Sequence, residues 1–488
     1  MLIGVLAALS AGCGTEADNA LLLPADIASP PDTSRLTLVA RLVQISDTHI
    51  VDIESPARFA GADEFVDVAW RPWEAYSTQI LDGILRTINR LHAAGQRIDF
   101  VIHTGDACDN VQSNELGWFL SVMDGGTVRP LSGPDDRAPD ARPVPALDPY
   151  ATFHAQGLYR AGVHGDLPSI PWYALFGNHD TYALGVFPVV ESPDGRRTAP
   201  LPLSCRPGIL LPSVLDPVGS WAHGNVTPAN PGPPALLTLP SYVTPNPDRA
   251  YFSKREFIRS MFATATGPAG HGFLPDAGNG SCGYGVSVLA GLRLIALDTA
   301  DAPLSIPGLP YPEGCISEVQ GRILRDELEA AQNRGELVIV ATHHPSRAIM
   351  AAYGSALAPQ DLRDMLNACP NVILHLAGHT HQNRVADRGG YLEIETCSTI
   401  DPPQEGRIIE IWRDGADGSV AIGYRMFSHI DDTWPPLGDD PLRAMREQAR
   451  AIAVHGGAIT AQQKPLVDAD ANPQGSPSDR AGLIRLHR

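Results

Sequence analysis

Five short polar motifs in this chain combine the side chains that proteins use to hold divalent metal ions. They are Asp47-Thr-His49, Gly105-Asp106-Ala-Cys-Asp109, Gly177-Asn178-His179-Asp180, His343-His344-Pro345 and Gly378-His379-Thr-His381. Carboxylate and amide oxygens together with imidazole nitrogens suit Mn, Fe, Zn or Co. The seven cysteines include no Cys-x-x-Cys pair, which disfavours a thiolate zinc site. One such motif would be weak evidence, but five in succession indicate a site for two metal ions.

The charge of such a site can be counted from its carboxylates, Asp47 and Asp106. Against two divalent cations they leave a net charge of about +2 when the imidazoles are neutral. The neutral Asn178, where a third Asp would be acceptable, keeps this surplus positive. Two metals about 3.5–4 Å apart can clamp the attacking and leaving oxygens of a phosphate ester and lower the pKa of a bound water. The residue types therefore favour phosphate ester hydrolysis.

Each motif directly follows a short apolar run that is typical of a buried strand. These runs are residues 36–46, 98–104, 170–176, 337–342 and 372–377. Helical patterns at 76–94 and 319–333 lie between them, and this alternation predicts an α/β fold with much parallel sheet. Further strands are expected within 288–299 and, as a hairpin, within 407–428. Because ligands of α/β sheets bind beyond the carboxyl ends of strands, the five motifs should converge on one crevice.

The order of these motifs resembles the calcineurin-like metallophosphoesterase superfamily, over roughly residues 40–400. The resemblance implies an α/β fold of two packed mixed β-sheets flanked by helices, here with long loop insertions. It also implies hydrolysis of a phosphate mono- or diester by a metal-bound hydroxide. By the same resemblance, one metal is held by Asp47, His49 and His381, the other by Asn178, His343 and His379, and both are bridged by Asp106.

The resemblance also assigns residues that contact the substrate. His179 corresponds to the family's phosphate-facing histidine, which can protonate the leaving oxygen, and Asp109 to the carboxylate that orients it in some members. His344, Asn110 and His271 are the further substrate-binding candidates. At two positions the sequence departs from known branches of the family, which disfavours membership of those branches. Asp109 stands where purple acid phosphatases carry Tyr, and Asn110 follows it where protein Ser/Thr phosphatases carry Arg.

The ends of the chain are expected to lie outside the catalytic domain. Residues 1–13 resemble a bacterial signal peptide with a lipobox ending at Cys13, although no Lys or Arg precedes the apolar run, and 14–35 read as a tether. The catalytic domain is expected over 36–430, with insertions at 124–149 and 186–285. Residues 431–488 are predicted to form a C-terminal extension with a short helix and a weakly ordered tail. This organisation predicts an exported lipoprotein of the cell envelope, held at the membrane only by lipid on Cys13.

The net charge of −19 limits the kinds of molecule that the protein is expected to bind. An acidic chain repels polyanions, so we expect a small phosphate ester as substrate and no broad nucleic-acid binding. Two alternatives remain: a phosphodiesterase acting on nucleotides or nucleic acid, and a catalytically silent metal-binding lipoprotein, which should lack a ligand or His179. Apart from Cys13, six cysteines remain, and the sequence favours neither disulfides nor free thiols. It specifies neither the substrate nor the oligomeric state.

Overall fold

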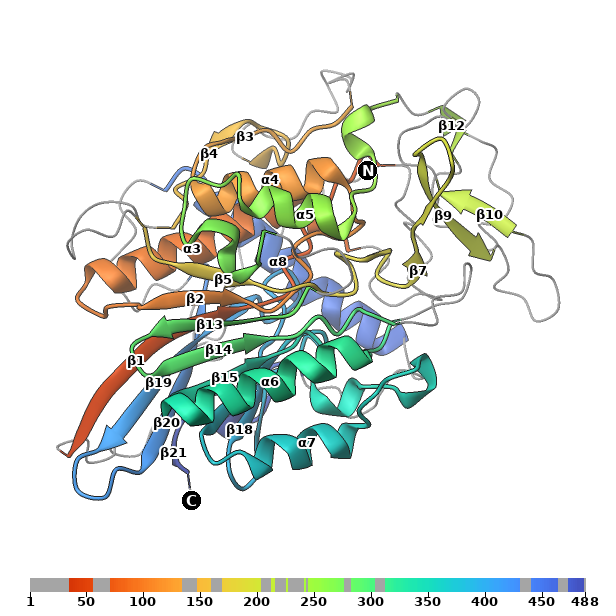
Figure 1. Cartoon of the computed structure of the whole chain (residues 1–488). Helices are drawn as coiled ribbons and strands as arrows, with labels where there is room; N and C mark the ends of the chain where they lie inside the picture. Colours follow the sequence, from red (N-terminus) through yellow and green to blue (C-terminus); the bar gives the residue numbers. More distant parts are fainter. Residues whose placement is uncertain are drawn as a thin grey trace.

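The computed structural model describes most of the chain from residue 35 onward (Figure 1). The described residues are 35–55, 71–133, 147–158, 169–202, 212–215, 225–226, 241–242, 245–275, 282–302, 312–430, 440–463 and 473–486. The expected signal peptide, Cys13, the tether up to residue 34 and Cys205 lie outside them, so the envelope lipoprotein stays a prediction. Within the described ranges, no helix combines the length and apolar character that a membrane span requires.

The first of two large sheets carries the first three motifs. It has six strands in the order β21-β20-β19-β1-β2-β5. They are β1 (Leu36–Ile45), β2 (Phe100–His103), β5 (Trp172–Ala174), β19 (Glu405–Asp414), β20 (Val420–Ser428) and β21 (Ala481–Arg485). β1, β2 and β5 are parallel, whereas β19, β20 and β21 pair antiparallel to their neighbours. The parallel strands therefore end at one edge.

The second sheet carries the last two motifs. Its order is β13-β14-β15-β16-β18-β17. The strands are β13 (Tyr284–Leu289), β14 (Leu292–Ala296), β15 (Leu337–Ala341), β16 (Val372–Ala377), β17 (Arg384–Asp387) and β18 (Leu392–Glu395). β14, β15, β16 and β18 are parallel, and the outer strands β13 and β17 are antiparallel. Every residue of β15 and β16 is buried, as expected for apolar strands covered on both faces.

Helices cover both sheets on the outside (Figure 1). α3 (Ser77–Ala93), α4 (Ser113–Asp124) and α5 (Lys254–Met261) lie on one side, and α6 (Glu318–Arg334) and α7 (Pro359–Ala368) lie on the other. α6 begins after Ser317, whose side chain accepts from the amide of Gln320, and ends at Gly335 in a left-handed conformation. The expected architecture of two mixed sheets flanked by helices is confirmed.

A buried glutamine joins the two sheets beneath the motifs. Nε2 of Gln44 on β1 donates to Oγ1 of Thr104 (3.2 Å) and to the carbonyl oxygen of Ala377 (2.9 Å), at the end of β16. Its Oε1 accepts a 2.8 Å bond from Oγ1 of Thr396. All polar atoms of this fully buried side chain are thus bonded, which fixes the two strand edges relative to each other.

The expected insertions contain more structure than loops alone. The first insertion contains β3 (Thr127–Val128), and the second contains β7 (Phe187–Pro188), β8 (Val190–Glu191), β9 (Arg197–Pro202), β10 (Pro212–Leu215), β11 (Asn225–Val226) and β12 (Ser241–Tyr242). β4 (Phe153–His154) and β6 (Tyr182–Ala183) lie just outside the insertions and pair with β3 and β7. α5 also falls within the expected insertion 186–285, and its Phe257 and Met261 are buried in the main core. This part of the insertion therefore belongs to the folded domain.

The C-terminal segment differs from the expected weakly ordered tail. After α8 (Arg443–Gln463), α9 (Pro477–Arg480) leads into β21, which pairs with β20 and completes the first sheet. Arg480 forms an ion pair with Glu405 (2.7 Å), and the hydroxyl of Tyr424 donates to the carbonyl of Ser478 (2.7 Å). The prediction of a weakly ordered tail is thus wrong for 473–486, which pair and pack as described above. A five-residue edge strand carries too little periodicity to be recognised.

The cysteines that the structure describes do not pair. Cys108, Cys282, Cys315 and Cys397 are buried, Cys369 is partly buried, and all five are free. Burial raises the pKa of the Cys397 thiol to about 12. Of the two alternatives that the sequence left open, free thiols hold for these five.

Candidate metal centre

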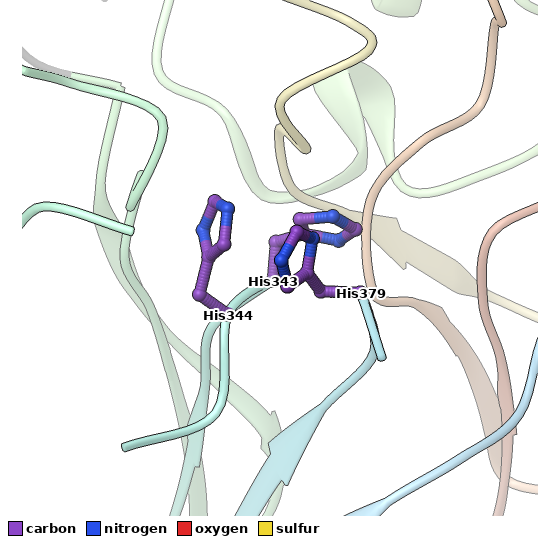
Figure 2. Close-up of side chains that lie close together, drawn as sticks. All are labelled: His343, His344 and His379. Atoms are coloured by element: carbon purple, nitrogen blue, oxygen red, sulfur yellow. The ribbon is translucent and has the colours of Figure 1, made fainter. Parts of the chain in front are cut away.

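The five motifs meet where the two sheets come together. β1, β2 and β5 bring Asp47, Asp106 and Asn178 from the first sheet, and β15 and β16 bring His343 and His379 from the second. Figure 2 shows His343, His344 and His379 side by side at these strand ends. Four overlapping groups of Asp and His there have ligand atoms within 4.8 Å of one another. The crevice expected from the sequence is therefore present.

One half of the site contains Asp47, His49 and His381. Nε2 of His49 lies 3.2 Å from Nε2 of His381, which lies 3.3 Å from Oδ1 of Asp47. Atoms that share one cation at about 2.0–2.2 Å lie roughly 3–3.5 Å apart. The remaining distance, from Nε2 of His49 to Oδ1 of Asp47, is longer at 3.9 Å, but all three ligand atoms lie close enough to surround one ion.

The other half contains Asn178, His343 and His379. Oδ1 of Asn178 lies 2.9 Å from Nε2 of His343 and 3.1 Å from Nδ1 of His379. Nδ2 of Asn178 donates to the carbonyl of Gly185 (2.9 Å), so the amide presents its oxygen to the two histidines. This orientation is the one that a metal ligand requires.

Asp106 lies between the halves. Its Oδ1 accepts the backbone amide of His179 (2.8 Å), which leaves Oδ2 directed at the histidines. Oδ2 lies 3.6 Å from Nε2 of His49 and 3.2 Å from Nε2 of His343. A single carboxylate oxygen is therefore placed next to one histidine of each half, as a bridging ligand would be.

Hydrogen bonds behind the histidines decide which ring nitrogen faces the site. Nδ1 of His49 lies 2.9 Å from Oδ1 of Asp109, and Nδ1 of His343 lies 2.8 Å from the carbonyl of Thr104. Nδ1 of His381 lies 2.7 Å from Oδ2 of Asp401. Since these oxygens only accept, each Nδ1 carries a proton, and each Nε2 is the nitrogen that faces the site and can give a lone pair to a metal. This pattern is typical of metal-ligating histidines.

The backbone at the site is held in a strained conformation. Five of the candidate ligands have a positive φ between 40° and 67°: Asp47, His49, Asp106, His379 and His381. A left-handed conformation costs an L residue about 1–2 kcal/mol. Glycines make the close packing possible, because a Cβ on Gly177 would lie 2.0 Å from Oδ1 of Asp106 and one on Gly378 would lie 2.5 Å from Oδ2 of Asp47. Such concentrated strain is typical of functional sites.

The electrostatics of the site favour positive charge. Burial lowers the pKa of a histidine, but the nearby Asp106 and Asp47 outweigh it and raise the pKa of His343 to about 9. Burial is likewise outweighed at His381, where Asp47 and the hydrogen bond to Asp401 raise the pKa to about 10. The carboxylates therefore attract cations to the inward-facing nitrogens. Oxygen and imidazole ligands, their spacing and this charge together fit two divalent metal ions.

His179 stands beside the ligands with a separate set of contacts. Its ring centroid lies 4.5 Å from that of His49. Nδ1 lies 2.8 Å from the backbone carbonyl of Asp109 and 3.6 Å from its carboxylate. Asp109 thus meets His179 through its main chain, and its carboxylate instead orients His49. The expected carboxylate–histidine pair is corrected accordingly.

Two of the substrate-binding candidates lie at the site with their side-chain nitrogens engaged in hydrogen bonds. His344 is fully buried; its Nδ1 bonds to Oγ1 of Thr299 (2.8 Å) and its Nε2 to the carbonyl of Pro312 (3.1 Å). Nδ2 of Asn110, also buried, lies 3.3 Å from Oδ2 of Asp109. Both side chains therefore support neighbouring residues, and neither presents a free donor to a substrate.

The structure does not bring His271 to the site. Its ring stacks on Trp172 with centroids 3.5 Å apart, and it is fully buried. Nδ1 lies 3.0 Å from the carbonyl of Trp172, and Nε2 lies 2.7 Å from Oγ1 of Thr264. With both nitrogens bonded inside the domain, none is left for a substrate. The neighbouring glycines allow tight packing, because a Cβ on Gly270 would lie 2.3 Å from the ring of Phe262 and one on Gly272 would lie 2.2 Å from the ring of Tyr284.

Two residues that the sequence did not single out connect to the ligands. Asp401 bonds Nδ1 of His381, and Arg71 lies 2.7 Å from Asp401 and 3.4 Å from Asp109. Asp401 could have been found, because it follows β18 as the other motifs follow their strands. Its strand, Leu-Glu-Ile-Glu, lacks the continuous apolar run that marked the others. Nothing in the sequence around Arg71 distinguishes it from the other arginines of the chain.

Part of the chain matches a known protein family. A model described as calcineurin-like phosphoesterase matches residues 40–219, which include Asp47, Asp106 and Asn178. No curated protein matches the chain.

Two solved structures are similar in part. A dimetal phosphatase from Danio rerio has 13% identity and a TM-score of 0.41, covering 81% of this chain and 98% of its own. A putative 5'-nucleotidase from Staphylococcus aureus, solved with alpha-ketoglutarate, has 11% identity and a TM-score of 0.33, covering 84% of this chain and 58% of its own. At these scores neither bears on the chemistry of the site.

Proposed function

Because residues 40–219 place the chain in the calcineurin-like phosphoesterase family, it is a metal-dependent phosphoester hydrolase, and we propose that it cleaves a small phosphate mono- or diester. The observation that carries this proposal is that the candidate metal ligands are clustered while one further histidine beside them is not part of the cluster's contacts. Seven side chains direct ligand atoms at one another, while His179 next to them is bonded to none of them through its ring. Such a group is available to the substrate.

The ligand set determines which ions we propose. Two divalent cations of the Mn, Fe, Zn or Co type, when bound, would neutralise charge on the phosphoryl group and lower the pKa of a water molecule. The chain's own contribution is placement. Asp106 is fixed by the amide of His179, and Asn178 is fixed by the carbonyl of Gly185, so neither ligand has to reorganise when substrate arrives.

His179 is proposed to act on the leaving group. Its Nδ1–H donates to the carbonyl of Asp109, which fixes the ring plane and leaves Nε2 as the nitrogen that can hold a proton for the substrate. Transfer of that proton to the departing oxygen would avoid an alkoxide. Nε2 lies against Gly185, where a Cβ would come within 2.2 Å of it, so the ring can occupy this position only beside a glycine.

The test compares para-nitrophenyl phosphate with its bis-ester. Metal-stripped protein is refilled with Mn²⁺, Zn²⁺, Fe²⁺ or Co²⁺, and Asp106→Ala serves as the control. We expect turnover that requires metal and disappears in the control, with the ratio of the two rates assigning the mono- or diester preference. Two ions bound per chain without turnover of any phosphate ester would reject catalysis and favour the metal-binding protein.

A nucleic-acid substrate is less well supported. The net charge of −19 opposes the approach of a polyanion, and specific nucleic-acid binding depends on phosphate contacts to a basic surface. A nucleotide carries few charges and remains within the proposed class of small phosphate esters.

A further inference from the structure

A closed chain of contacts lies around one half of the metal site. Oδ1 of Asp109 lies 2.9 Å from Nδ1 of His49, and Oδ2 of Asp401 lies 2.7 Å from Nδ1 of His381. Arg71 connects the two carboxylates, with Nε 2.7 Å from Oδ1 of Asp401 and Nη1 3.4 Å from Oδ1 of Asp109. On the inner side, the Nε2 atoms of His49 and His381 lie 3.2 Å apart.

We propose that Arg71 is a positioning residue that sets the separation of His49 and His381 by bridging the two carboxylates behind them. The inference rests on the proposed metal binding, and it concerns only the half of the site formed by Asp47, His49 and His381. Arg71 touches neither histidine, so it acts through Asp109 and Asp401.

The position of Arg71 is itself fixed. Its side chain is 3% exposed, and its backbone amide donates to Oε2 of Glu74 (3.0 Å). Two residues further on, Nε1 of Trp73 donates to the carbonyl of Ile400 (2.8 Å), which ties the two segments together next to Asp401. Asp401 is also anchored on the other side, because its amide donates to Oγ of Ser398 (3.1 Å), and that hydroxyl donates to the carbonyl of Asp47 (2.7 Å).

The chemistry of arginine explains why this residue type is needed. The planar guanidinium presents several donors in fixed directions, so one side chain can meet two carboxylates at a set angle, whereas a lysine ammonium is a flexible point charge. Arg71 also offsets one of two buried negative charges, which would otherwise repel each other across the first ion position. The other half lacks this device among the described residues, since Nδ1 of His343 is held by a backbone carbonyl.

The test measures metal binding directly. Full-length protein is stripped, and Zn²⁺ or Mn²⁺ affinity and stoichiometry are read by competition with a chromophoric chelator, for wild type, Arg71→Lys, Arg71→Met and Asp401→Asn. We expect wild type to bind two ions and each variant to lose about 10–100-fold in affinity at one of them. Arg249→Lys is the matched control, because Arg249 also forms a buried ion pair, but with Asp52 in place of Asp109 and Asp401.

Two backgrounds assign the loss to the proposed half. His343→Ala should leave only the ion held by Asp47, His49 and His381, and adding Arg71→Lys should lower the affinity for it. His381→Ala should leave only the other ion, and adding Arg71→Lys should change its affinity little. Urea unfolding in EDTA shows whether each variant is folded. Equal loss at both ions, or affinities within twofold of wild type in folded Arg71→Lys, would overturn the positioning role. Absence of metal binding by wild type would instead reject the proposed function.

Discussion

Nδ1 of His179 lies 2.8 Å from the backbone carbonyl of Asp109, whereas the Asp109 carboxylate lies 2.9 Å from Nδ1 of His49. One residue thus serves two histidines with different parts of its structure. A substitution of the Asp109 side chain keeps the carbonyl that holds His179 and removes the acceptor that holds His49. The two roles can therefore be separated by experiment.

Asp109→Asn should weaken metal binding and spare the placement of His179. An amide that turns its oxygen to His49 must direct its NH₂ elsewhere, and loss of such an outer contact typically reduces metal affinity about 10–100-fold. Excess metal should then restore most of the turnover. Chelator competition and activity at saturating metal check this, and an activity loss that excess metal leaves unchanged would contradict it.

His179→Asn should remove proton donation without removing the metals. General acid catalysis typically contributes about 10²–10⁴-fold, so kcat should fall within that range while two ions remain bound. The loss should be small for para-nitrophenyl phosphate, whose leaving group needs little protonation, and large for an alkyl phosphate. A loss of the same size for both esters would show that His179 does not act on the leaving oxygen.

Gly185→Ala should disturb both His179 and Asn178. Gly185 has a φ of 69°, and its Cβ would lie 2.2 Å from Nε2 of His179 and 2.7 Å from Nδ2 of Asn178. The left-handed backbone costs alanine about 1–2 kcal/mol, and the contacts force one site residue to move. We expect a tenfold or greater loss of kcat/KM in a folded protein. Gly195→Ala is the control, because its φ of 81° is similar and no atom lies within 4 Å of its Cβ.

The convergence of the candidate ligands could be predicted because each motif follows a short apolar strand. The runs before Asp47, Asp106 and His343 are rich in Val and Ile, and their expected bounds lie within two residues of β1, β2 and β15. The contact between Arg71 and Asp401 could not be predicted, since the two residues are 330 positions apart and meet only in the folded protein. The same holds for His271, where stacking on Trp172 depends on a contact across 99 positions. The hydrophobic pattern of a helix or strand indicates which of its faces is buried. It does not indicate which distant segment of the chain packs against that face.

His271 should make the protein less stable in mild acid. Burial lowers its pKa to about 4 from 6.5, so the folded state excludes a proton that the unfolded chain accepts. The stabilisation is complete above pH 6.5 and is lost as the pH falls towards 4, on the order of 3 kcal/mol in total. Urea unfolding in EDTA at pH 7.5 and 5.0 should show a smaller decrease for His271→Phe, which retains the stacking. Parallel decreases in both proteins would contradict this.

Metal binding should stabilise the fold as well as enable turnover. In the absence of cations the chain must hold Asp47 and Asp106 close together and keep five ligand residues in left-handed conformations, each at about 1–2 kcal/mol. Ions that bind only the folded state offset these costs, by about 2.7 kcal/mol at 100 times the dissociation constant. Thermal unfolding should therefore shift upward by several degrees when Mn²⁺ or Zn²⁺ is added to stripped protein, and EDTA should reverse the shift. Asp106→Asn should abolish most of the response because the bridging charge is lost. A shift of the same size in that variant would place the stabilising ions elsewhere on the protein.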